Sequence, residues 1–252
     1  MRIHPAAILP LVLVLLSLLS GCASTAGPSE ASQKKAAQIN ARLGANYLRQ
    51  GSLDLANEKL QKALRQDEDN VDAHATYALL QMELGKPAEA RRHFREALSL
   101  SPDDPDLHNN YGTFLCNQED YEAGIKQFLR AAENRLYSTP EYAYANAGVC
   151  AVDAGLPREA RQYLRQALEI EPRLPAALRE LAQLEFRNGR AVEARSYLER
   201  YHANVKSTAE TLLLAARIER RLGNHNRADE YGRKLLRNFP DSDEAQRFLE
   251  ER

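Results

Sequence analysis

The chain has 252 residues, of which 44% are hydrophobic and 27% are charged, and its formal net charge is −1. This balance, without a block of one sign, is typical of a soluble helical protein with solvated helix faces. The sequence shows no basic stripe of the kind that forms a nucleic-acid-binding surface, so we expect no nucleic acid partner.

Residues 1–21 are expected to be a signal peptide. Arg2 and His4 precede an apolar run of 14 residues, Ala6–Leu19, which is too short to span a bilayer comfortably. The run ends in the letters LSGC, which resemble the lipobox of bacterial lipoproteins, where the chain is cut before the cysteine. The resemblance implies acyl chains on Cys22, and two or more such chains anchor a protein stably. An ordinary signal peptide with a coincidental cysteine is the alternative.

The residues after Cys22 indicate where the anchor would lie. Ala23 and Ser24 follow, with no aspartate beside the cysteine. By analogy with bacterial lipoproteins, this favours the outer membrane, with the protein facing the periplasm. Residues 22–36 are rich in Ala, Ser, Gly and Pro and have no apolar periodicity, so we expect a flexible linker there.

From residue 37 to residue 252 the chain is expected to be one repeat domain. The segment Val71–Asp104 is 34 residues long, with small residues at positions 8, 20 and 27, large residues at 7 and 24, glycine at 15 and proline at 32. This pattern resembles the tetratricopeptide repeat, a helix–turn–helix unit. Units in the same phase begin at residues 37, 71, 105, 141, 175 and 209.

One such unit cannot bury its own apolar face, so neighbouring units must stack. We therefore predict an all-α fold, a right-handed α-solenoid of six tetratricopeptide repeats. The last segment, Asp241–Arg252, is predicted to be a capping helix that covers the open end, with Asp241, Ser242 and Asp243 as candidate N-caps. A helical bundle without repeats is the alternative.

The junction between repeats 3 and 4, Ala132–Pro140, carries a two-residue insertion that includes Leu136 and Tyr137. Insertions in solenoids map to loops on one face. The insertion is therefore either a longer turn or a contact point for a partner.

Lipidation of Cys22 would leave Cys116 and Cys150 as an even pair in an oxidising compartment. They occupy position 12 of repeat 3 and position 10 of repeat 4, in the second half of the first helix of each repeat. Because first helices of neighbouring repeats pack side by side, we predict a disulfide between them, with two buried thiols as the alternative. No nucleophile signature surrounds either cysteine, so a catalytic thiol is not expected.

The sequence contains no phosphate-binding loop, zinc-ligand spacing or nucleophile elbow, so we expect no enzyme activity, no cofactor and no metal. The expected function is protein binding on the concave face, which the first helix of each repeat lines. The groove positions are 2, 5, 9, 12 and 13. In repeats 1 and 2 they form an apolar strip with charged rims, suited to an extended or helical peptide. These residues are Ala41, Ala45, Leu48, Arg49, Ala75, Leu79, Met82 and Glu83.

Asn110 and Asn146 occupy position 6 of repeats 3 and 4. Many repeat proteins of this type use an asparagine there to hold a ligand backbone, and local packing or capping is an equal alternative. Arg217, Arg220 and Arg221 form a basic end in repeat 6, which we interpret as solvated surface.

Three segments carry a more specific resemblance: Leu107–Cys116 (LHNNYGTFLC), the Leu136–Tyr137 pair and Asn146–Cys150 (NAGVC). Together with the lipobox, the linker, the six repeats and the insertion, they resemble the type IV pilus biogenesis lipoproteins called PilF or PilW. The resemblance implies a pilotin that sits under the outer membrane, binds the secretin subunit through its first repeats, and helps it reach that membrane and multimerise.

A different outer-membrane scaffold, for peptidoglycan enzymes or for barrel assembly, is the alternative function. It would share the fold, the anchor and the compartment. In either case we expect a monomer.

Overall fold

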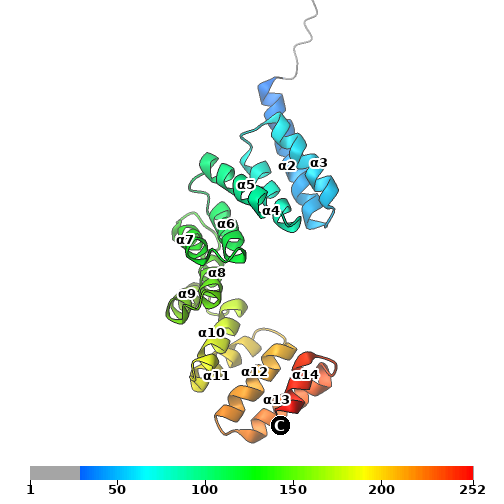
Figure 1. Ribbon diagram of the computed structural model, residues 1–252. Helices are drawn as coiled ribbons and strands as arrows, with labels where there is room; N and C mark the ends of the chain where they lie inside the picture. Colours follow the sequence, from blue (N-terminus) through cyan, green and yellow to red (C-terminus); the bar gives the residue numbers. More distant parts are fainter. Residues whose placement is uncertain (1–28, 252) are drawn as a thin grey trace, which may run out of the picture.

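The protein is described by a computed structural model that covers residues 29–251; the expected signal peptide and Cys22 lie outside these residues. The described chain consists of thirteen α-helices, arranged as six antiparallel pairs and one terminal helix (Figure 1). The pairs are α2 (Glu30–Arg49) with α3 (Leu53–Gln66), α4 (Val71–Glu83) with α5 (Pro87–Leu100), α6 (Pro105–Asn117) with α7 (Tyr121–Glu133), α8 (Pro140–Asp153) with α9 (Pro157–Ile170), α10 (Pro175–Arg187) with α11 (Ala191–His202), and α12 (Ala209–Arg221) with α13 (His225–Asn238), followed by α14 (Asp243–Glu250).

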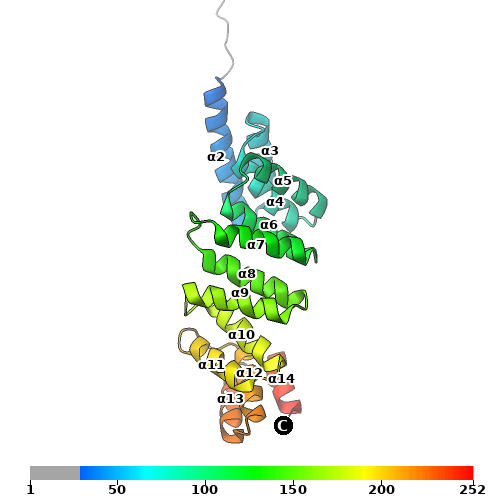
Figure 2. The same cartoon turned by 90° about the vertical axis from the view of Figure 1, so that its left-hand side faces the viewer.

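The pairs stack in chain order into a curved solenoid, which confirms the predicted fold class (Figures 1 and 2). We call the first helix of each pair the A helix and the second the B helix. In the middle of the stack, α6 and α8 lie on the inner side of the curve, while α7 and α9 lie on the outer side and face the viewer in Figure 2. The A helices therefore line the concave face there.

The predicted phase of the repeats matches the helix starts. The A helices of repeats 2, 3, 5 and 6 begin at residues 71, 105, 175 and 209, and that of repeat 4 begins at Pro140, one residue before the predicted start. Local chemistry fixes these points. The side chain of Asn70 caps α4 by accepting from the backbone N–H of Ala73 at 2.9 Å, and Asp104 caps α6 just before Pro105 at its first position.

The turn between A and B helices requires a left-handed residue at position 15. Glycine fills this position in five repeats, with φ between 65° and 77°. In repeat 3 the residue is Glu119, with φ of 61°. A residue with a Cβ costs roughly 1–2 kcal/mol in this conformation, so repeat 3 carries a local strain that the other five repeats avoid.

The first helix starts earlier than expected. Helix α2 begins at Glu30, so residues 30–36 are helical although a flexible linker was expected there. The Ser29 side chain accepts from the backbone N–H of Ser32 at 3.3 Å, which caps the helix. Lys34 pairs with Glu30 at 2.8 Å, one turn apart. These local contacts stabilise the first turn, and the alanines, the glutamine and the lysines of residues 31–37 favour the helix.

Close approach of the two helices in a repeat depends on a small residue at position 8. In repeats 1, 3 and 4 this residue is glycine, and an added Cβ would lie 2.5–2.9 Å from the large side chain at position 24. The facing pairs are Gly44 with Leu60, Gly112 with Phe128, and Gly148 with Leu164. The large side chain therefore packs directly on the backbone of the A helix.

The last repeat reverses this arrangement. Position 24 of repeat 6 is Gly232, and an added Cβ there would lie 1.8 Å from Cζ of Phe248 in α14. Phe248 is 1% exposed and packs with Leu212, Ala216 and Leu235. The capping helix therefore supplies the large side chain that repeat 6 lacks. Of the three candidate caps for α14, Ser242 accepts from the backbone N–H of Ala245 at 3.2 Å.

The packing of Phe248 against Gly232 gives a first prediction. Gly232→Leu restores the residue that repeats 1, 4 and 5 carry at position 24, yet it should lower the free energy of unfolding by about 3 kcal/mol because the new side chain displaces Phe248. Phe248→Ala should cost about 3–5 kcal/mol by leaving a cavity. The double variant should cost less than the sum, since leucine fills the vacated space.

Urea unfolding followed by circular dichroism measures these differences. Leu249→Ala is the matched control, because Leu249 lies on the same helix and is exposed; it should change stability by less than about 0.5 kcal/mol. If the costs of Gly232→Leu and Phe248→Ala add in the double variant, Phe248 does not fill the space beside Gly232.

Candidate protein-binding surfaces

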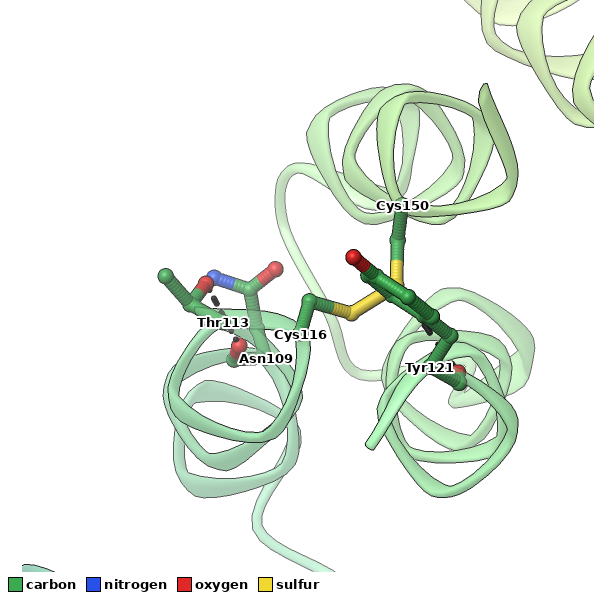
Figure 3. Close-up of a disulfide and its surroundings, with 5 residues drawn as sticks. All are labelled: Asn109, Thr113, Cys116, Tyr121 and Cys150. Atoms are coloured by element: carbon green, nitrogen blue, oxygen red, sulfur yellow. Dashed lines mark hydrogen bonds between the residues drawn. A yellow bond between two sulfur atoms is a disulfide. The ribbon is translucent and has the colours of Figure 1, made fainter. Parts of the chain in front are cut away.

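The structure joins Cys116 of α6 and Cys150 of α8 in a disulfide, with a Cα–Cα distance of 5.9 Å. Figure 3 shows the bridge at the meeting point of α6, α7 and α8. Sγ of Cys150 lies 3.7 Å from the carbonyl oxygen of Tyr121 in α7; a disulfide sulfur carries no hydrogen, so this is a packing contact. The bridge therefore links two neighbouring A helices across the end of the intervening B helix.

Gly124 makes room for this bridge. It stands at position 20, which is alanine in the five other repeats. An added Cβ at Gly124 would lie 2.3 Å from Sγ of Cys116 and 3.0 Å from the carbonyl oxygen of Gly112. The sulfur thus occupies the volume that a methyl group takes elsewhere in the solenoid.

The predicted groove residues of repeats 1 and 2 differ in their accessibility. Ala41 is 1% exposed and packs with Ala63 and Ala73, so it belongs to the core and not to a binding surface. Five others are half-buried, and Arg49 and Glu83 are exposed on the rim. The half-buried residues are Ala45, Leu48, Ala75, Leu79 and Met82.

The larger apolar groove residues also take part in packing. Leu48 contacts the cluster that contains Leu60 and Leu80, and Leu79 and Met82 contact the cluster around Phe94. These side chains therefore present only one edge to the groove. A substitution at any of these three residues therefore changes both the packing of the fold and the surface of the groove.

The two predicted asparagines behave differently. The Asn146 side-chain amide donates to Oδ1 of Asn109 at 3.0 Å, which links α8 to α6 close to the disulfide. Asn110 is half-buried. Asn146 therefore makes a packing contact of the kind that stood as the alternative to ligand binding.

The N-terminal end of the solenoid exposes apolar side chains that the sequence reasoning missed. Ile39 and Leu43 stand at positions 3 and 7 of repeat 1 and are 53% and 37% exposed. At position 3 the other five repeats bury their residue, and position 7 is at least half-buried in them. Repeat 1 has no earlier repeat among the described residues to cover this face. Farther along the chain, Leu136, which was predicted to lie in a longer turn or a contact point after repeat 3, is 90% exposed.

At the other end, the concave face is hollowed. A recess of about 280 Å³ lies among α10, α12 and α14, and we call it the C-terminal hollow. Its lining residues are Gln183, Phe186, Arg187, Glu210, Leu213, Leu214, Arg217, Glu244 and Arg247. Most of those in repeats 5 and 6 stand at groove positions 2, 5, 9, 12 and 13. The predicted groove register therefore extends to this end, where Arg217 had been interpreted as solvated surface.

Among residues 29–251, no helix is long and apolar enough to cross a membrane. Nor does that part of the chain bring together three or more His, Cys, Asp or Glu side chains in a cluster suited to a metal ion.

Comparison with known proteins identifies the family. The tetratricopeptide repeat family matches residues 41–105, 76–139, 151–218 and 210–242. The chain is 29% identical over 246 residues to the type IV pilus assembly protein PilF of Pseudomonas aeruginosa, covering 96% of this chain and 98% of that protein. The solved structure of PilW, described as a widely conserved type IV pilus biogenesis factor, shares 33% identity and a TM-score of 0.77 over 84% of this chain and 98% of its own.

The chain belongs to the PilF/PilW family of tetratricopeptide repeat proteins. A solved structure of Pseudomonas aeruginosa PilF agrees, with 30% identity and a TM-score of 0.77 over 87% of this chain and 99% of that one. The PilF/PilW resemblance predicted from LHNNYGTFLC and the segments after it is therefore confirmed.

This PilF/PilW chain also buries a histidine pair that sequence reasoning did not identify as a unit. His74 in α4 and His93 in α5 are both buried, and their Nδ1 atoms lie 2.9 Å apart. His74 Nε2 lies 2.8 Å from the carbonyl oxygen of Glu68, and a nitrogen of Arg92 lies 3.2 Å from His93 Nε2. Since the carbonyl can only accept and the guanidinium can only donate, both imidazoles are neutral, and His93 donates to His74.

The next repeat has the same arrangement with one residue changed. His108 Nε2 lies 2.8 Å from the carbonyl oxygen of Pro102, and its Nδ1 lies 2.7 Å from Oε1 of Gln127. Gln127 stands at position 23, as His93 does in repeat 2. A histidine at position 4 thus ties the preceding inter-repeat turn to the A helix in both repeats.

Burial, and after it the charge of Arg92, lower the pKa of His93 to about 4, while the charge of Glu89 opposes them. The unfolded chain binds a proton near pH 6.5. The folded state binds this proton less readily, so the contribution of His93 to stability is complete above pH 6.5 and falls as the pH drops toward 4. We expect a loss of up to about 3 kcal/mol across this window.

His93→Gln is the matched variant, because it copies the natural His108–Gln127 pair. It should fold, and its unfolding midpoint in urea should change much less between pH 6.5 and pH 4 than that of the unmodified chain. Equal pH dependence in the two proteins would show that His93 is not the cause.

The Gly124 contact gives a separate prediction. Gly124→Ala should lower the free energy of unfolding by about 2 kcal/mol in the disulfide-bonded protein, because the methyl group collides with Sγ of Cys116. In a Cys116→Ala/Cys150→Ala background the same change should cost much less, because the sulfur is gone and the close contact with the Gly112 carbonyl oxygen is offset by the higher helix propensity of alanine. Repeats 1 and 4 already combine glycine at position 8 with alanine at position 20. The same cost in both backgrounds would refute this account.

Proposed function

We propose that this protein is an envelope protein of type IV pilus biogenesis that acts as a pilotin. It is anchored in the outer membrane by lipid on Cys22, faces the periplasm, and binds the secretin subunit. By doing so it promotes the arrival of the secretin at the outer membrane and its multimerisation. The protein acts by binding and has no catalytic role.

One observation carries this proposal. The similarity to PilF, a protein named for type IV pilus assembly, runs through 96% of this chain and 98% of that protein. The matches to the tetratricopeptide repeat family lie within residues 41–242, so this alignment extends beyond the repeats themselves. The alignment therefore supports a shared role of the whole architecture and not of the repeat unit alone.

The structure supports repeats 1 and 2 as the client-binding region. Leu48, Leu79 and Met82 present half-buried apolar edges. Arg49 and Glu83 stand exposed beside them as charges of opposite sign. Repeat 1 adds Ile39 and Leu43 to the same half of the molecule, and both are exposed within the described residues 29–251. A peptide that buries these side chains would gain roughly 25 cal/mol for each Å² of apolar surface removed from water.

The test is made in cells that lack the protein and receive variants of it. We expect the deletion to reduce the heat-resistant secretin multimer in the outer membrane fraction. Cys22→Ala should move the protein to the soluble periplasmic fraction and reproduce that loss. Leu79→Glu should keep the membrane location but weaken multimer formation, because it places a charge on the apolar edge of the groove.

Leu84→Glu is the matched control, since Leu84 is the exposed C-cap residue of the same helix α4. It should leave the secretin multimer intact. Thermal unfolding of the purified Leu79→Glu protein separates binding from stability, because Leu79 also touches the Phe94 cluster. Normal outer-membrane multimers in the deletion strain would reject the pilotin role and favour the alternative, a scaffold for another envelope complex.

A further inference from the structure

The C-terminal hollow has the shape of a socket for a side chain. Phe186, Leu213 and Leu214 form its apolar lining. Its volume of about 280 Å³ lies at the lower end of the range for small-molecule pockets. One large apolar side chain of a partner fits this volume, with its backbone passing along the open concave face.

The surroundings of the hollow are rich in arginine. Arg187, Arg217 and Arg247 line it. The guanidinium of Arg221 lies 5.6 Å from the ring centroid of Phe186. Arg220 lies over the ring of Phe248 at the same distance and donates to the Glu251 carbonyl oxygen at 2.9 Å. Three arginines therefore line an aromatic and aliphatic recess and Arg221 lies over its Phe186 ring, whereas Arg220 contacts Phe248, which is not part of the lining.

The acidic residues near the hollow offset only part of this charge. Arg217 Nε donates to both carboxylate oxygens of Glu251, at 3.1 and 3.0 Å. This contact lowers the pKa of Glu251, so the pair stays charged. Glu210 accepts from Gln183 at 2.5 Å, and Glu244 lines the hollow as the third acid. Arg187, Arg217, Arg221 and Arg247, set against Glu210, Glu244 and Glu251, leave one positive charge in excess.

The unpaired arginines stand where an incoming acid can reach them. Arg187 and Arg247 are exposed, and neither forms a salt bridge within residues 29–251. Glu210 and Glu244 lie in the first turns of α12 and α14, whereas Arg187 lies in the last turn of α10. The helix dipoles favour each of these placements. Acidic and basic side chains therefore alternate around the apolar lining, and Arg247 lies one turn from Glu244 on α14.

We propose that the C-terminal hollow binds an acidic segment of a partner polypeptide, in which a phenylalanine or leucine is flanked by Asp or Glu. The apolar side chain enters among Phe186, Leu213 and Leu214. The flanking carboxylates pair with Arg187 and Arg247, where arginine offers two donors to one carboxylate. This site is additional to the proposed client groove of repeats 1 and 2, at the opposite end of the solenoid.

The experiment measures fluorescence anisotropy of a fluorescein-labelled peptide, Gly-Ser-Asp-Asp-Phe-Asp-Asp-Ser, with the purified full chain. We expect saturable binding. Arg187→Glu and Arg247→Glu should each weaken it by about tenfold or more, since each change replaces attraction with repulsion. Two companion peptides, one with lysine for every aspartate and one with alanine for phenylalanine, should bind at least about tenfold more weakly.

Arg158→Glu is the matched control, because Arg158 is an exposed arginine on the B helix α9 and the substitution changes the charge equally. It should leave the affinity within about twofold. Thermal unfolding checks that every variant is folded. Leu79→Glu should also leave the affinity unchanged, so that a failure of this site and a failure of the proposed function are separate results.

Three outcomes would overturn the proposal. One is an acidic peptide that does not saturate the full chain at millimolar concentration. Another is equal affinity of the Arg187→Glu and Arg158→Glu proteins, which would mean diffuse charge attraction. The last is binding of phosphatidylglycerol vesicles that depends on Arg187 and Arg247 while the peptide does not bind, which would assign the arginines to a lipid surface.

Discussion

The close approach of the A and B helices within each repeat is the contact on which the rest of the solenoid depends. A hydrogen or a methyl group at positions 8 and 20 lets the helices meet, and a large side chain at position 24 fills the space that remains. Two departures from this scheme show how strictly the volume is conserved. At position 20, Gly124 replaces the usual alanine, and a disulfide sulfur occupies the space of the methyl group. At position 24, Gly232 replaces the usual large side chain, and Phe248 of the next helix fills its space. Volume lost at one position is replaced from elsewhere.

Much of the fold could be predicted from the sequence, because the small residues recur at a fixed spacing and each marks a helix contact. The phase of the repeats, the helix starts and the capping helix follow from such local signals. The early start of α2 was also encoded locally, in Ser29 and the Glu30–Lys34 pair, but the alanine-rich composition was interpreted as linker. Residues 30–36 consist mainly of good helix formers, Ala, Glu, Gln and Lys, whereas the Gly and Pro of the expected linker lie before them at positions 27 and 28.

The candidate site was less predictable, since a groove position says where a side chain stands in one repeat and not what lies opposite. Ala41 occupies groove position 5 but is closed off by Ala63 and Ala73. The C-terminal hollow needs residues from α10, α12 and α14 together, so it depends on the curvature between repeats. The His74–His93 pair likewise joins two helices through side chains whose chemistry is evident only when they meet. The position of a residue within its repeat therefore does not say which side chains it contacts.

The disulfide has a mechanical consequence for this linear array. In a solenoid each repeat touches only its neighbours, so unravelling can begin at either end and proceed one repeat at a time. Cys116 and Cys150 are 34 residues apart, and the segment between them includes the whole of α7. A chain pulled from its two ends would therefore reach a full length roughly 110 Å shorter than the same chain without the bridge, because the bridged segment cannot extend. Under load, the centre of the molecule would act as a fixed link between two extensible arms.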